Sequence, residues 1–114
     1  MIIKNLQDVP LEDTSALKGV DKHIPIGPRE GSEEIVMRVI TVSPGNHSPY
    51  HHHDYPHLIK VEEGRAVAWD KDKNETPVEA GNFIYVPAND THGFYNNGSV
   101  PFRFICIVPR RGEK

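Results

Sequence analysis

The sequence has almost no cysteine, no excess of positive charge and no long apolar run, and each shortage excludes a class of protein. Its one cysteine, Cys106, cannot form a disulfide within the chain, so a disulfide-stabilised secreted scaffold is excluded. No segment approaches the roughly 20 apolar residues of a membrane-spanning helix. Met1 to Asp8 lack the basic and apolar parts of a secretory signal, and we therefore expect a cytoplasmic protein.

The charge balance argues against nucleic acid and membrane surfaces as partners. The formal net charge is -3 at pH 7, and the only basic cluster is the pair Arg110 and Arg111. Such a chain has no overall attraction to phosphate groups. Its 114 residues are enough for one hydrophobic core and too few for two.

Turn-forming residues divide the chain into short segments that suit strands better than helices. Ten prolines and nine glycines are spread along it. The spacing predicts an all-β domain, either a sandwich or a closed barrel. The predicted strands cover residues 34–42, 57–62, 65–69, 83–86 and 102–108.

The first thirty residues are expected to form an extension to a domain that spans residues 31–114. Lys22 to Ile26 is predicted to be an edge strand, where Pro25 would be tolerated. Leu11 to Leu17 is predicted to form one helical turn.

Histidines are concentrated in one short stretch. Four of the seven lie between His51 and His57, and His92 follows the predicted strand that ends near Pro87. On an extended chain His51 and His53 point to the same side, while His52 points to the other. The residues Asp54 to Pro56 suit a turn that would bring His57 back to them. Taken alone, an HxH pair is more typical of surface or core histidines than of a metal site.

Two spaced motifs make the sequence similar to the cupin family. The first cupin motif, GX5HXHX3-4EX6G, corresponds to Gly45, His51, His53, His57 and Gly64. The second, GX5PXGX2HX3N, corresponds to Gly81, Pro87, Asn89, His92 and Asn96. Two departures stand out: Asn89 replaces a glycine, and His57 replaces the usual glutamate. Asn tolerates left-handed backbone angles, so we expect the turn at Asn89 to persist.

The resemblance implies a single jelly-roll barrel, the double-stranded β-helix of cupins, with one metal ion per chain. The implied ligands are His51, His53, His57 and His92, as in small four-histidine cupins. Manganese or iron is the expected ion, with nickel, zinc, copper and cobalt as alternatives, because imidazole accepts most first-row ions. No organic cofactor is implied. The resemblance also implies a homodimer, formed through the N-terminal strand and one face of the barrel.

Alternation in the last predicted strand identifies candidates for the pocket wall. Arg103 is unlikely to face a core, so Phe102, Phe104, Cys106 and Val108 are predicted to share the inner face. In the four-histidine cupins a cysteine of this strand faces the metal cavity. Phe104 and Cys106 are therefore pocket candidates. Tyr85, an aromatic residue of the predicted strand 83–86, is a third candidate for the pocket wall, and no catalytic residue is assigned.

Three functions fit this pattern. The first is a metal-dependent dioxygenase or other oxidoreductase that cleaves a carbon–carbon bond in a small chelating substrate, such as an enol, diketone or phenol. The second is a structural metalloprotein or a small-ligand-binding module without turnover. The third is a metal-dependent isomerase or decarboxylase, which is disfavoured because His57 stands where a carboxylate base would be useful.

Overall fold

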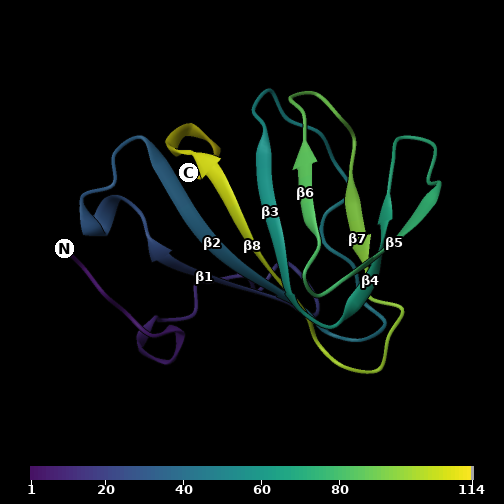
Figure 1. Cartoon of the computed structure of the whole chain (residues 1–114), viewed down its shortest axis with the longest axis horizontal. Coiled ribbons are helices and arrows are strands. Elements are labelled where there is room, and N and C mark those ends of the chain that lie inside the picture. Colours follow the sequence, from purple (N-terminus) through teal and green to yellow (C-terminus); the bar gives the residue numbers. More distant parts are fainter. Residues whose placement is uncertain (114) are drawn as a thin grey trace.

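A computed structural model describes residues 1–113 and arranges eight strands in two antiparallel sheets (Figure 1). The strands are β1 (Val20–Ile26), β2 (Ile35–Val42), β3 (His57–Glu63), β4 (Arg65–Trp69), β5 (Glu75–Glu79), β6 (Phe83–Val86), β7 (Gly93–Tyr95) and β8 (Phe102–Pro109). One sheet has the order β1-β2-β8-β3-β6 and the other the order β5-β4-β7. Three short 3-10 helices accompany them, η1 (Leu6–Asp8), η2 (Pro28–Glu30) and η3 (Arg110–Gly112). Among the described residues, no helix is long and apolar enough to span a bilayer. The fold is an all-β jelly-roll barrel.

The predicted strands agree with this architecture, and two further strands were not predicted. The five predicted core segments correspond to β2, β3, β4, β6 and β8, and the predicted edge strand corresponds to β1 at the edge of the five-stranded sheet. β5 was missed because it is polar and contains Pro77, and β7 because it has only three residues. The helical turn predicted for Leu11 to Leu17 is wrong, since the nearest turn of 3-10 helix is η1.

The core lies between the inner faces of the two sheets. Along β8 buried and partly buried residues alternate, which confirms the predicted inner face of Phe102, Phe104, Cys106 and Val108. The register places Val42 opposite Phe102 and Val36 opposite Val108 on β2. Burial of these apolar side chains, at roughly 25 cal/mol per Å² removed from water, is the main source of the barrel's stability.

Left-handed backbone conformations occur where the two spaced motifs require them. Gly64, between β3 and β4, has φ 78°, and a Cβ there would overlap the carbonyl oxygen of Pro101. Asn89 has φ 67°, so the turn does persist with asparagine in place of glycine. This turn connects β6 to His92, and it therefore sets where that histidine enters the barrel.

Candidate metal centre

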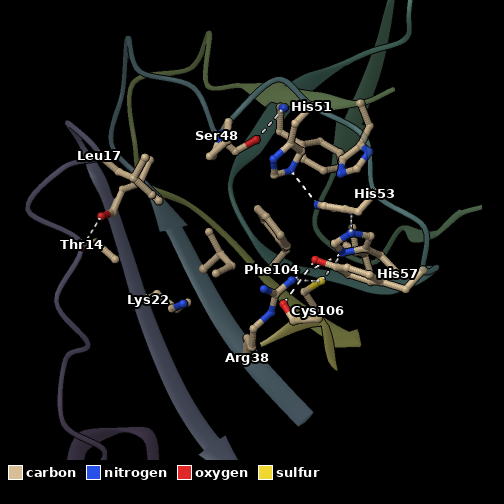
Figure 2. Close-up of a pocket in the computed structure, with 18 residues that line it drawn as sticks. Thr14, Leu17, Lys22, Arg38, Ser48, His51, His53, His57, Phe104 and Cys106 are labelled. Carbon is tan, nitrogen blue, oxygen red and sulfur yellow. Dashed lines mark hydrogen bonds between the residues drawn. The ribbon is translucent and has the colours of Figure 1, made fainter. Parts of the chain in front are cut away.

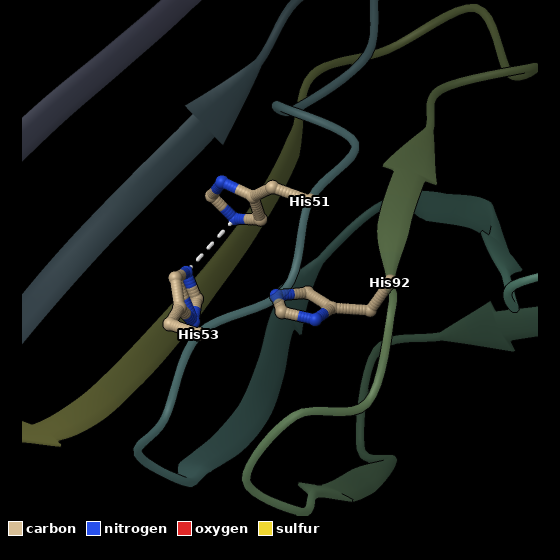
Figure 3. Close-up of side chains that lie close together, drawn as sticks. All are labelled: His51, His53 and His92. Carbon is tan, nitrogen blue, oxygen red and sulfur yellow. Dashed lines mark hydrogen bonds between the residues drawn. The ribbon is translucent and has the colours of Figure 1, made fainter.

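Three imidazole rings from two segments of the chain meet at one end of the barrel (Figure 3). His51 and His53 belong to the connection between β2 and β3, and His92 immediately precedes β7. Backbone hydrogen bonds join His51 and His92 in both directions, at 3.1 and 2.9 Å. This small antiparallel bridge fixes the two backbones side by side, so their side chains enter the same space.

The ring nitrogens lie close enough together for these histidines to hold one metal ion. One nitrogen from each of His51, His53 and His92 lies within 4.8 Å of the others. The Nε2 atoms of His51 and His53 are 3.1 Å apart. Two ligands at right angles around an ion, each about 2.1 Å from it, are separated by about 3.0 Å, whereas tetrahedral ligands are separated by about 3.4 Å. The spacing of the His51 and His53 nitrogens therefore suits two ligands of one divalent transition-metal ion.

His57, at the start of β3, adjoins this group on its buried side. Its Nε2 lies 3.0 Å from Nδ1 of His53, the nitrogen that His53 does not turn toward His51. The ring of His57 is 4.9 Å from that of His92, measured between centroids. All four histidines are thus brought together, with three in a compact group and the fourth in contact with His53.

Neighbouring groups orient the rings of His92, His57 and His53. Nδ1 of His92 lies 2.8 Å from the carbonyl oxygen of Asp90, so Nδ1–H donates and Nε2 keeps its lone pair for a ligand. Nδ1 of His57 lies 3.0 Å from Sγ of Cys106. The ring of His53 stacks on that of Tyr55 at 4.4 Å with an interplanar angle of 11°. These three rings are therefore positioned by contacts within the protein.

The site favours uncharged imidazoles, which are the form that binds metal ions. Burial, followed by the nearby charges of His92 and other cationic groups, lowers the pKa of His57 to about 3. The same causes, burial first, lower the pKa of His51 to about 4. Burial also lowers the pKa of His53. In the absence of an ion His51 and His57 are therefore uncharged at pH 7.

A cavity of about 290 Å³ opens onto the imidazoles (Figure 2). Phe104 and Cys106 form part of its wall, together with Tyr55 and Phe94. Cys106 is only 1% exposed, and burial raises the pKa of its thiol. The thiol is thus kept protonated at neutral pH and acts as a wall and hydrogen-bonding partner of His57, not as a nucleophile.

Tyr85 does not line the cavity, in contrast to the sequence-based prediction. It pairs with Leu58 in the β3–β6 register, while the neighbouring pair of His57 and Val86 is buried. Because side chains alternate across a strand, Tyr85 points to the outer face, where it is 64% exposed. His52 is exposed, and His47 packs against Trp69 with ring centroids 5.6 Å apart.

Two cationic side chains in the cavity were missed by the sequence analysis. Arg38 on β2 and Lys22 on β1 are both among its lining residues. Arg38 lies between Val36 and Ile40 on the inward side of an alternating strand, and a charge in that position was the signal that could have revealed it. Its register partner is Cys106.

With this geometry established, similarity to known proteins identifies the family. The cupin domain family matches residues 38–108, which is more than half of the chain. The chain belongs to the cupin family. The matched region contains both spaced motifs and all four clustered histidines.

Three relatives illustrate the range of this cupin's neighbours. The polyketide cyclase RemF from Streptomyces resistomycificus has a similar structure, with a TM-score of 0.89, 26% identity, and coverage of 96% of this chain and 80% of RemF. A predicted oxalate decarboxylase from Thermotoga maritima shares the fold, with a TM-score of 0.81, 16% identity, and coverage of 95% and 98%. Auxin-binding protein 1 from Arabidopsis thaliana is 25% identical over 96% of this chain, which spans 59% of that protein's length.

Proposed function

We propose that this cupin binds one divalent transition-metal ion and acts on a small chelating substrate, an enol, a diketone or a phenol. The ligands in this proposal are His51, His53, His57 and His92, and the preferred ions are manganese and iron. The observation that carries the proposal is the 3.1 Å spacing of the His51 and His53 nitrogens at the end of a cavity of about 290 Å³. Four protein ligands leave two positions of an octahedral ion for a chelating pair of oxygens.

The ion and the protein would contribute different parts of the chemistry. When bound, such an ion supplies a Lewis acid for two substrate oxygens and, if it is manganese or iron, a route for electron transfer to dioxygen. The described lining residues include no carboxylate, so an acidic substrate that loses its own proton is favoured over one that needs a strong base. Phe104 and Phe94 supply an apolar wall for the body of the ligand.

Oxidative carbon–carbon cleavage is the reaction we propose first. The two open positions that would serve a chelate could instead hold one substrate oxygen together with dioxygen. A redox-neutral cyclisation is the second candidate. The observation that favours it is the similarity to the polyketide cyclase RemF over 96% of this chain. Both reactions begin from a chelating 1,3-dicarbonyl compound or its enol, so the substrate class is common to them.

Metal analysis and ligand binding test this proposal directly. The untagged protein is purified, its metal content is measured, and acetylacetone is titrated into the metal-loaded form while its ultraviolet absorption and dissolved oxygen are followed. We expect about one ion per chain, a shifted enolate band and, for oxidative cleavage, oxygen uptake. His51→Ala should lose the ion, whereas His52→Ala, which changes an exposed neighbour, should keep it. A protein that holds no ion under any loading condition, or one whose ion admits no chelator, would contradict the proposal.

A further inference from the structure

Two cationic side chains stand together at the end of the cavity that lies away from His51 (Figure 2). Lys22 on β1 pairs in register with Ile40, and Arg38 is two residues earlier on the same face of β2. Both side chains are largely buried, with 25% of Lys22 and 13% of Arg38 exposed. Buried charges of one sign are costly unless an anion compensates them.

The compensating anion is the carboxylate of Glu113. One oxygen lies 2.8 Å from Nζ of Lys22, and the other lies 3.3 Å from Nη1 of Arg38. Glu113 follows η3, in a segment that folds back from β8 across the edge of the cavity, where Gly112 lines it. The side chain of Glu113 is 12% exposed.

This compensation is incomplete in both charge and geometry. One carboxylate faces two cations, which leaves a net positive charge. A guanidinium binds a carboxylate best through two parallel N–H donors, but Arg38 contacts Glu113 through a single nitrogen at 3.3 Å. Within the described chain, Nε of Arg38 is buried without a hydrogen-bond partner. The pair of cations therefore has unused capacity for an anion.

We infer that Lys22 and Arg38 form a carboxylate-binding subsite, and that Glu113 occupies it until the carboxylate of a ligand takes its place. The inference deepens the proposed function and rests on it, because it specifies that the chelating enol, diketone or phenol also carries a carboxylate. A carboxylate is the group indicated, since the two cations already hold one. Displacement leaves Glu113 free to turn outward, because the segment that carries it lies at the surface.

The subsite lies close enough to the imidazoles for one small molecule to reach both. Nη2 of Arg38 is 3.5 Å from Nδ1 of His57 and 3.1 Å from Sγ of Cys106. A ligand with its chelating oxygens at the imidazoles and its carboxylate about one aromatic ring away therefore fits a cavity of about 290 Å³. Lys22 and Arg38 are specificity-determining residues in this arrangement, with no part in the bond changes.

The carboxylate of Glu113 competes with any ligand carboxylate for Lys22 and Arg38. Glu113 is tethered beside the cations, and a tethered group competes at an effective concentration in the millimolar range. A simple carboxylate must overcome this competitor, whereas a ligand that also chelates an ion gains additional free energy elsewhere. Glu113 therefore discriminates against small anions that lack the chelating group.

The test uses the metal-free protein, so that the subsite is measured apart from the metal centre. Benzoate and its uncharged analogue benzamide are titrated into protein kept in a chelating buffer, and dissociation constants are obtained from NMR shifts. Glu113→Gln should bind benzoate at least tenfold more tightly than the wild type does, and its affinity for benzamide should not change. Glu79→Gln, which removes an exposed carboxylate elsewhere, should behave as the wild type.

A second variant confirms that the cations bind the anion. Adding Lys22→Met to Glu113→Gln should remove the gain in benzoate affinity. Lys22→Gln serves the same purpose if the methionine variant does not fold, as judged by circular dichroism. Equal benzoate affinity in the wild type and Glu113→Gln, or equal gains for benzoate and benzamide, would overturn the inference. Because no ion is present, these outcomes are independent of the acetylacetone titration, and either proposal can fail alone.

Discussion

Replacing Asn96 by alanine is expected to destabilise the barrel by about 3 kcal/mol. Asn96 is the last residue of the second spaced motif, and it is fully buried. Its Nδ2 donates to the carbonyl oxygens of Val42 and Val100, both at 2.9 Å, and its Oδ1 accepts from the backbone N–H of Gly98 at 2.9 Å. One side chain thus links the end of β2, at Val42, to the connection between β7 and β8, at Gly98 and Val100.

The expected loss of unfolding free energy follows from the three backbone groups that lose their hydrogen-bond partner in Asn96→Ala. Each net hydrogen bond contributes about 1 kcal/mol, and a buried group left without a partner costs about 1–3 kcal/mol. The carbonyl oxygen of Val42 is the most deeply enclosed, since Val42 itself is 0% exposed. Three lost bonds therefore amount to about 3 kcal/mol, which is a large part of the roughly 5–15 kcal/mol that holds a small domain together.

Urea unfolding followed by circular dichroism measures this loss. The matched control is Asn97→Ala, because Asn97 is the exposed neighbour and its removal should change the free energy of unfolding by less than about 0.5 kcal/mol. If Asn96→Ala costs less than about 1 kcal/mol, water or a rearranged turn replaces these bonds, and the structural role assigned to Asn96 is wrong.

Two further predictions concern pH and self-association. The pKa of His57 is lowered to about 3 and that of His51 to about 4. The metal-free protein should therefore have its full stability above pH 6.5 and lose stability progressively as the pH falls toward 4. Over this range the unfolded chain takes up protons that the folded chain does not. Urea midpoints in a chelating buffer that stay constant between pH 7 and pH 4.5 would exclude this linkage. We also expect a homodimer through the outer face of the five-stranded sheet, because Leu58 and Tyr85 are adjacent there and 54% and 64% exposed. Leu58→Asp should then elute as a monomer in size exclusion with light scattering, and a wild-type monomer would remove the basis of this expectation.

The strands could be predicted because alternation is a local signal. In β8 every second residue is apolar and buried, so Cys106 was placed on the inner face from sequence alone. Phe83 to Val86 lacks such a signal, because all four residues of β6 are apolar. Only the register with β3 decides that Val86 faces inward and Tyr85 outward. The error at Tyr85 therefore arose where the facing depends on a long-range pairing.

The histidines could be grouped from motif spacing, whereas the charges around them could not. Motif spacing is set by local turns, such as the one at Asn89. The contact of Lys22 with Glu113 joins residues 91 positions apart, and it depends on how β1 and the segment after β8 meet in space. No periodic pattern in the sequence predicts a contact between such distant residues.

The histidine at position 57 accounts for the arrangement of the neighbouring charges. Nη2 of Arg38 lies 3.5 Å from the ring of His57, so a glutamate at this position would stand within reach of the guanidinium and could neutralise it. A neutral imidazole cannot do so. Arg38 must then find its anion elsewhere, and Glu113 provides it at 3.3 Å. Having histidine at position 57, where the family motif has glutamate, thus has two linked effects. A bound ion would keep its full charge, because no ligand is negatively charged. Arg38 needs a carboxylate from a residue that is not a metal ligand. Both effects make the cavity more selective for anionic ligands, which is the property that the subsite of Lys22 and Arg38 would exploit.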